Sequence, residues 1–151
     1  MRATLRRIHD GDIEAICSNP RAADVREMEA VGKTFEDAVV ESVRISDWVA
    51  CGVLDGRPVF LFGVAPLSFL SGRGVPWLLA SAELDGAERL FLRTCAGVVA
   101  AMRETYPRLI NVVDARNTRT IRWLGWLGFQ INREPVAVNG RPFHVFHLGE
   151  N

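Results

Sequence analysis

The chain has 151 residues, which is enough for one domain with a substantial apolar core. Its 18 basic and 18 acidic side chains cancel, so no net charge draws the chain onto nucleic acid or an acidic membrane. Three separated cysteines form no Cys-x-x-Cys pair, and no apolar run is long enough to span a bilayer, so we expect buried thiols and no membrane segment.

Apolar periodicity and turn residues divide the chain into strands and helices. In chain order we expect a strand at 4–8, a helix that Asp10 caps and Asn19-Pro20 ends, a helix at 22–31, a helix that starts at Thr34, strands at 48–54 and 58–64, a loop at 67–74, a strand at 75–82, a long helix at 87–106, a strand at 109–113, a helix capped by Asn117 or Thr118, and strands at 129–138 and 141–148. This order predicts an α/β (α+β) fold in one domain spanning 1–151, with a mixed, mostly antiparallel sheet and helices on both faces.

Two dipeptides predict the hairpins. Asp55-Gly56 and Asn139-Gly140 each separate two strand-like runs, and both positions of such a turn need a positive φ. The long helix is marked by one apolar stripe at helical spacing, comprising Phe91, Cys95, Val98 and Met102.

The helix that starts near Asn117 carries a family resemblance. Asn117, Trp123, Gly128 and Phe129 fall at the spacing of the last conserved helix of the GNAT (Gcn5-related N-acetyltransferase) superfamily. The strand, helix and strand at 75–113 resemble that family's cofactor-binding core, and the resemblance covers about 2–148. It implies a GNAT-like fold and, if the chain is an enzyme, acetyl-CoA as the acyl donor.

Short runs at 76–79, 91–93, 111–117 and 121–124 resemble a bacteriophage branch of this fold, which includes the internal virion protein of short-tailed phages. That resemblance implies a structural or assembly component of a virion. Its partners would be other virion proteins or further copies of the chain, and its location the virion or the host cytoplasm, with no signal peptide for secretion.

Two features count against a working acetyltransferase. The stretch at 81–89, where the family has a glycine-rich pyrophosphate loop, holds one glycine and three acids, Glu83, Asp85 and Glu88. These acids would repel a pyrophosphate unless other groups intervene, although acids also favour helix starts. The family's general-acid tyrosine is replaced by Leu124, which cannot donate a proton.

Two residues remain as site candidates. Glu83 is the candidate catalytic base, or alternatively an acid at a helix start. Asn117 is the candidate contact for the pantetheine arm of the cofactor, as in the family, or alternatively a helix cap. The chain's only tyrosine, Tyr106, is expected to be a packing residue.

We therefore expect a virion component with a degenerate cofactor site and no bound cofactor. The alternative is an acetyl-CoA-dependent N-acetyltransferase with an atypical pyrophosphate loop. An exposed apolar patch that includes Trp123 or Trp126 would favour assembly, and an open cleft between the fourth and fifth strands would favour the enzyme. His144 and His147 should point to opposite faces of a strand, so no metal site is expected.

Overall fold

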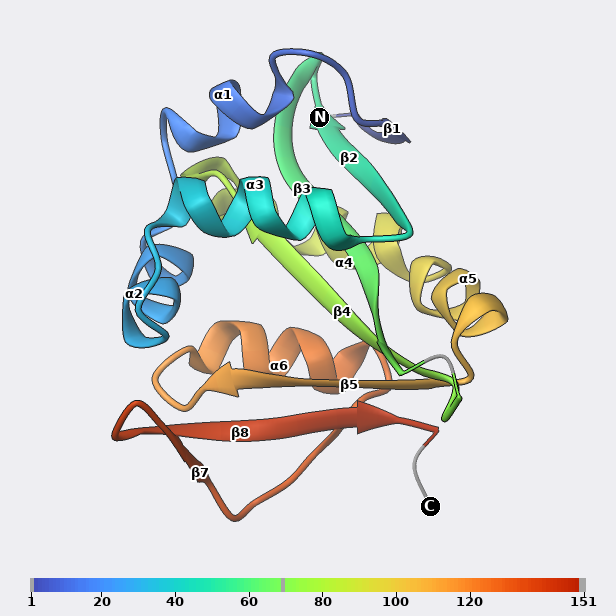
Figure 1. The fold of residues 1–151 in the computed structure, drawn as a ribbon. Helices are drawn as coiled ribbons and strands as arrows, with labels where there is room; N and C mark the ends of the chain where they lie inside the picture. Colours follow the sequence, from blue (N-terminus) through green and yellow to red (C-terminus); the bar gives the residue numbers. More distant parts are fainter. Residues whose placement is uncertain (1, 69, 150–151) are drawn as a thin grey trace.

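The computed structural model describes residues 2–68 and 70–149 of the chain (Figure 1). In chain order the elements are β1 (Ala3–Arg7), α1 (Asp12–Cys17), α2 (Ala22–Ala30), α3 (Phe35–Ile45), β2 (Trp48–Leu54), β3 (Arg57–Ser68), β4 (Arg73–Ala80), the 3₁₀ helix η1 (Ala82–Gly86), α4 (Glu88–Cys95), α5 (Val98–Thr105), β5 (Arg108–Asp114), α6 (Thr118–Trp126), β6 (Gln130–Ile131), β7 (Val136–Val138) and β8 (Arg141–Leu148). None of the described helices has the length and apolar character needed to cross a bilayer.

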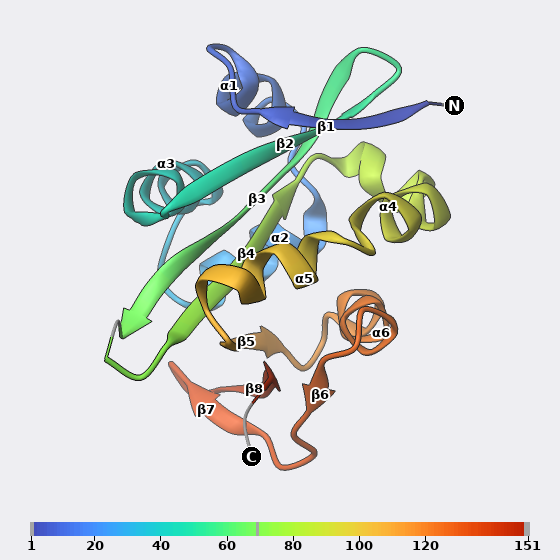
Figure 2. The ribbon, with the colours of Figure 1, turned by 90° about the vertical axis from the view of Figure 1, so that its right-hand side faces the viewer.

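The described strands form one mixed sheet in the order β1-β2-β3-β4-β5-β8-β6, with β7 paired to β8. Each pairing is antiparallel except that between β4 and β5, which is parallel. Figure 2 shows α1 and α3 on one side of strands β2–β4, and α4 and α5 on the other. The expected mixed sheet with helices on both faces is confirmed.

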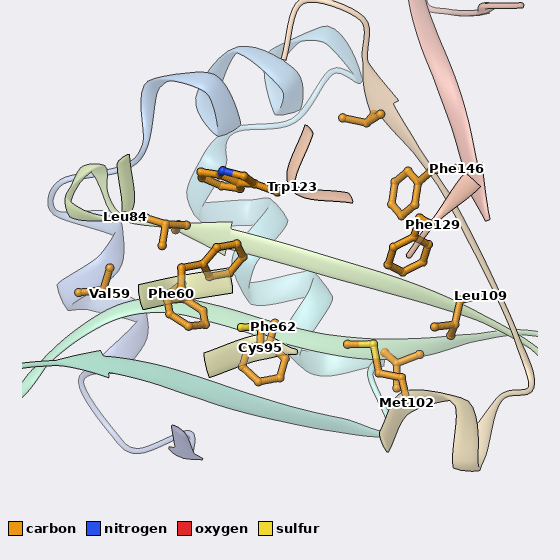
Figure 3. Close-up of a cluster of buried hydrophobic side chains, with 14 of the residues drawn as sticks. Val59, Phe60, Phe62, Leu84, Cys95, Met102, Leu109, Trp123, Phe129 and Phe146 are labelled. Atoms are coloured by element: carbon orange, nitrogen blue, oxygen red, sulfur yellow. The ribbon is translucent and has the colours of Figure 1, made fainter. Parts of the chain in front are cut away.

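Each face of the sheet carries its own apolar core. On the side of α4 and α6, Phe60, Phe91 and Trp123 pack in a chain of ring contacts (Figure 3). On the side of α1 and α3, Ile16 and Val39 are fully buried. The sheet is thus covered on both sides, as its near-continuous apolar strands require.

The turn chemistry confirms the expected hairpins. Asp55 and Gly56 have φ values of 48° and 82°, and Asn139 and Gly140 have 50° and 76°. Thr34 caps α3 as expected, because its hydroxyl accepts a 3.1 Å hydrogen bond from the Asp37 N–H.

The expected cap at Asp10 is wrong. Gly11, with a φ of 90°, holds the N-cap position of α1, and its lack of a side chain makes that left-handed backbone accessible. The acid that stabilises the start of α1 is Asp12. Its Oδ2 accepts a 2.7 Å hydrogen bond from the His9 N–H, and its carboxylate pairs with Arg6.

Three expected boundaries also differ. The long helix at 87–106 is broken into α4 and α5 at Gly97, which costs about 1 kcal/mol in a helix interior. The strand at 129–138 is divided into β6 and β7, and Pro135 between them has no N–H for pairing. The loop at 67–74 is shorter, because β3 reaches Ser68 and β4 starts at Arg73; residue 69 of that loop lies outside the described residues.

Strands β4 and β5 pair over two positions only and then diverge. Arg73 is aligned with Arg108 and Gly74 with Leu109, and the strands separate beyond them (Figure 1). Alternate β4 residues face β5, and the next one after Gly74 is Pro76, which has no N–H to continue the ladder.

The side chain of Asn111 stands where backbone pairing would have continued. Its Nδ2 donates a 2.8 Å hydrogen bond to the Pro76 carbonyl, so a side chain from β5 spans the gap to β4. Pro76 therefore ends the parallel ladder, and Asn111 holds the two strands apart at a fixed spacing.

The start of this opening depends on the absence of a side chain at Gly74. A Cβ there would lie 2.6 Å from Cγ of the buried Tyr106. We expect Gly74→Ala to lower the free energy of unfolding by about 1–3 kcal/mol, because the ring and β4 must move apart.

Urea denaturation measures this change. Gly125→Ala on α6 is the matched control, because a Cβ there meets nothing within 4 Å, and it should be neutral or stabilising by up to about 1 kcal/mol. Equal stabilities of the two variants would contradict the close packing at Gly74.

Candidate functional site

The divergence of β4 and β5 leaves a cavity of about 480 Å³ that is lined from both faces of the sheet. On one face the lining includes Met28, Val31 and Trp77, from α2, the segment after it and β4. On the other face it includes Cys95 and Leu124, from α4 and α6. The volume falls within the usual range for small-molecule sites, roughly 300–1,000 Å³. Two ligands that enter from opposite faces can therefore meet between the strands.

Within the described residues, the charged side chains that line this cavity are Asp24, Glu27 and Lys33. Asp24 and Glu27 lie three residues apart on α2, which places both on the same helix face. Both carboxyls therefore enter a largely apolar cavity from one direction.

Asp24 is held in a buried ion pair. Its Oδ1 lies 3.0 Å from Nη1 of Arg21, and its Oδ2 accepts a 3.0 Å hydrogen bond from the Ala80 N–H. Burial raises the pKa of the Asp24 carboxyl to about 6, although the neighbouring Arg21 charge acts in the opposite direction.

Glu27 accepts a 2.7 Å hydrogen bond from the Asp114 N–H at the end of β5. Burial raises the pKa of the Glu27 carboxyl to about 7, against the lowering effect of that hydrogen bond. A carboxyl with a pKa near 7 can accept and release a proton at neutral pH, which is the property of a general base.

Arg21 joins three elements of the fold, α2, η1 and α6, near the end of β4. Its Nε donates to Asp85 at 2.7 Å, and its Nη1 donates to Thr120 at 2.9 Å as well as to Asp24. The guanidinium also lies 4.6 Å from the ring centre of Trp123. The side chain is only 1% exposed, so its hydrogen bonds connect α2 and η1 to α6 in the interior of the protein.

The three acids that follow β4 are each bound by a partner. Glu83 pairs with Arg57 at 3.0 Å, Asp85 pairs with Arg21 and with Arg119 at 3.3 Å, and Glu88 accepts a 2.6 Å hydrogen bond from Trp123 Nε1. Cations therefore offset the charges of Glu83 and Asp85, whereas Glu88 has a neutral hydrogen-bond donor.

The structure places Glu83 away from the cavity. It stands in the first turn of η1, where its N–H donates to the Ser81 hydroxyl at 3.4 Å, and its carboxylate lies on the exposed surface with Arg57. This position matches the alternative of a helix-start acid. The opening between the strands does not receive the Glu83 carboxylate.

The N-terminus of α4 forms a second hollow, of about 430 Å³. Its lining includes the exposed Arg89 and Arg93, which lie one helical turn apart. Backbone N–H groups at a helix start and two guanidinium groups can bind phosphate, but Asp85 and Glu88 line the same hollow and balance the two positive charges.

Asn117 occupies the N-cap position of α6, but its side chain forms no cap hydrogen bond. The residue is buried, and neither its Oδ1 nor its Nδ2 has a hydrogen-bond partner, although the amide lies close enough to Glu27 to lower the pKa of that carboxyl slightly. Buried amides are normally bonded, so the Asn117 amide, which lies beside Glu27 but outside the cavity lining, is a candidate contact for that carboxyl or for a ligand's polar group.

The aromatic residues divide between core and surface. Tyr106 is buried and donates its hydroxyl to Asp47, and burial raises the pKa of the phenol to about 12, in keeping with a packing role. Trp123 is buried, whereas Trp126 is 60% exposed. The patch that would have favoured assembly therefore does not include Trp123.

The two histidines of β8 both contact Asn132, which follows β6. His144 Nδ1 lies 2.8 Å from the Asn132 carbonyl oxygen, and His147 Nε2 lies 3.0 Å from Asn132 Oδ1. Across residues 2–68 and 70–149, no group of three or more His, Cys, Asp or Glu side chains is placed to hold a metal ion.

Several solved structures, among them acetyltransferases, match this chain over nearly its whole length. Ard1 from Thermoplasma volcanium matches with a TM-score of 0.70 and 15% identity, over 98% of this chain and 97% of that one. A GCN5-related N-acetyltransferase from Kribbella flavida matches with a TM-score of 0.68 and 17% identity, over 97% and 96%. The chain has a GNAT-like fold.

A third match is a GNAT superfamily phosphinothricin acetyltransferase from Sinorhizobium meliloti, in complex with acetyl-CoA. Its TM-score is 0.67 at 13% identity, over 98% of this chain and 88% of that one. No protein-family model and no curated protein matches the chain by sequence. At these identities the likeness establishes the fold, and the resemblance to a bacteriophage branch gains no support from it.

Sequence reasoning missed the acids of α2 and their partner Arg21. Asp24 and Glu27 looked like ordinary surface charges of a polar helix, because nothing in their spacing shows which face is covered. The sequence offered one signal, a pair of acids on one face of a helix that begins just after Pro20 and Arg21.

The raised pKa of Glu27 predicts a pH-dependent stability. The folded carboxyl holds its proton up to about pH 7, whereas the unfolded carboxyl releases it near 4.5. Folded-state stability is therefore lost as the pH rises between these values. Glu27→Gln removes this loss, so the variant should become more stable relative to the wild type between about pH 5 and pH 8.

Urea midpoints at a series of pH values test this. Glu29→Gln, an exposed change on the same helix, is the control and should track the wild type. A difference between wild type and Glu27→Gln that stays constant with pH would contradict the assignment.

Proposed function

We propose that this chain is an N-acyltransferase that takes acetyl-CoA as acyl donor and an amine as acceptor. The observation that carries the proposal is the cavity between β4 and β5, with Glu27 at its wall and the unsatisfied amide of Asn117 next to that carboxyl. The fold supports it, because the named solved structures that share it are acetyltransferases.

The residues present fit the donor in three places. The N-terminus of α4, with Arg89 and Arg93, would hold the pyrophosphate, where Arg21 and Arg119 offset Asp85 and the two arginines must outweigh Glu88. The backbone N–H and C=O of Leu78 face the opening. Alternate residues of a strand face the same side, and the N–H and C=O of Ala80, two residues along β4, bond to Asp24 and Arg21 on that side. Asn117 would meet the amides of the pantetheine arm.

When bound, acetyl-CoA would supply an acyl group activated as a thioester. Glu27, in its ionised form, would accept the proton that the amine must lose. The amine nitrogen then forms the bond to the acyl carbon, the carbon–sulfur bond breaks, and the electron pair remains on sulfur. Leu124 lines the cavity where the family has a tyrosine, so the sulfur receives its proton from solvent.

A role in a virion remains an expectation without a supporting observation. The assembly hypothesis named an exposed apolar patch that includes Trp123 or Trp126; Trp123 is in the core, and Trp126 is 60% exposed. Partners among virion proteins or further copies of the chain likewise stay predictions.

Acetyl-CoA binding tests the donor site directly. Calorimetric titration should show binding of acetyl-CoA to the wild type, and Asn117→Ala should weaken it about tenfold, the value of one or two hydrogen bonds. Gln130→Ala, which removes an exposed amide of β6, is the control and should bind as the wild type does. If the titration shows no binding at millimolar acetyl-CoA, the proposal is wrong.

The role of Glu27 has a kinetic signature. With a panel of primary amines and acetyl-CoA, release of free CoA thiol should rise with pH through about 7, because Glu27 must be ionised to accept a proton. Glu27→Gln should lower kcat/KM by roughly 10²–10⁴-fold.

Glu83→Gln is the control, since that carboxylate lies on the surface with Arg57. It should keep the wild-type rate within about twofold. Loss of activity in Glu83→Gln, with Glu27→Gln active, would transfer the base role to Glu83.

A further inference from the structure

The acceptor side of the cavity is an apolar chamber. Its wall towards α2 and α3 is formed by Met28, Val31, Ile45, Val75 and Trp77. Trp77 is fixed there, because its Nε1 donates a 2.7 Å hydrogen bond to the Ser46 hydroxyl. A molecule that fills this chamber must carry an apolar body to match the wall.

The chamber offers one carboxylate that no cation neutralises. Of the charged residues in the described lining, Asp24 is paired with Arg21, and Lys33 lies 3.5 Å from Glu41 at the surface. Glu27 has only the Asp114 N–H as a direct hydrogen-bond partner, besides the nearby Asn117 amide. An unpaired carboxylate in apolar surroundings is costly to ionise, and one positive charge on a ligand would compensate it.

The neutral polar groups of the lining are largely engaged. Asn111 donates to the Pro76 carbonyl, and Thr120 accepts from Arg21. A peptide would bring several backbone amides into the chamber, where few groups are free to form hydrogen bonds with them. Burying an amide without a hydrogen bond is costly, so a peptide is a poor match.

We infer that the acyl acceptor is a small primary monoamine with an apolar body, whose ammonium lies against Glu27. A polyamine would place a second ammonium against apolar side chains, or near Lys33, whose own ammonium repels it and already pairs with Glu41. This inference rests on the proposed N-acyltransferase function, since it names the substrate class of the same site.

Binding can be measured without turnover. In two-dimensional NMR at about pH 8, where the Glu27 carboxyl is ionised, the Trp77 indole N–H reports on the chamber, and Trp77→Phe assigns its signal. The probes are 2-phenylethylamine, its neutral analogue 2-phenylethanol, and spermidine. The wild type should bind 2-phenylethylamine at least about tenfold more tightly than either of the others, because only it matches both the charge and the wall.

Glu27→Gln should abolish the preference for the amine over the alcohol and leave the affinity for 2-phenylethanol unchanged. The ligand comparison on the wild type stands even if that variant fails to fold. Equal binding of amine and alcohol, or tighter binding of spermidine, would overturn the acceptor class. Amine selectivity together with absent acetyl-CoA binding would overturn the proposed function and confirm the ligand class, whereas the reverse would overturn the ligand class alone.

Discussion

The parallel pairing of β4 and β5 stops at Gly74, and the rest of the candidate site depends on that stop. Pro76 has no N–H to offer at the next position that faces β5, and Asn111 fills the gap with a side-chain hydrogen bond. A continuous ladder would close the sheet between its two apolar cores. The interrupted ladder leaves one cavity that both faces share, which is the geometric requirement for joining a donor and an acceptor.

Arg21 stabilises the other end of this opening. It joins Asp24 on α2, Asp85 in η1 and Thr120 on α6, and its guanidinium rests on Trp123. Breaking a buried ion pair by removal of one partner costs about 3–5 kcal/mol, so this network has a structural role as well as an electrostatic one. It leaves Glu27 as the carboxylate that can respond to a ligand.

The sequence predicted the parts of the fold that local chemistry decides. Asp55-Gly56 specifies its hairpin whatever lies around it, because the turn itself demands a positive φ. The break at Gly97 was missed because the apolar stripe continues across it. The acids Asp24 and Glu27 were missed because their partners, the Ala80 N–H of β4 and the Asp114 N–H of β5, lie 56 and 87 residues along the chain. Local pattern carries no information about such a partner.

The central claim is that the opening next to Pro76 receives the acyl donor. The most direct measurement is two-dimensional NMR of the labelled protein during titration with acetyl-CoA, following the Leu78 backbone N–H and the Asn117 side-chain amide. Both signals should shift and saturate together, since both groups face the proposed path of the pantetheine arm. Saturable binding that leaves both signals unmoved, or no binding at all, would contradict the account.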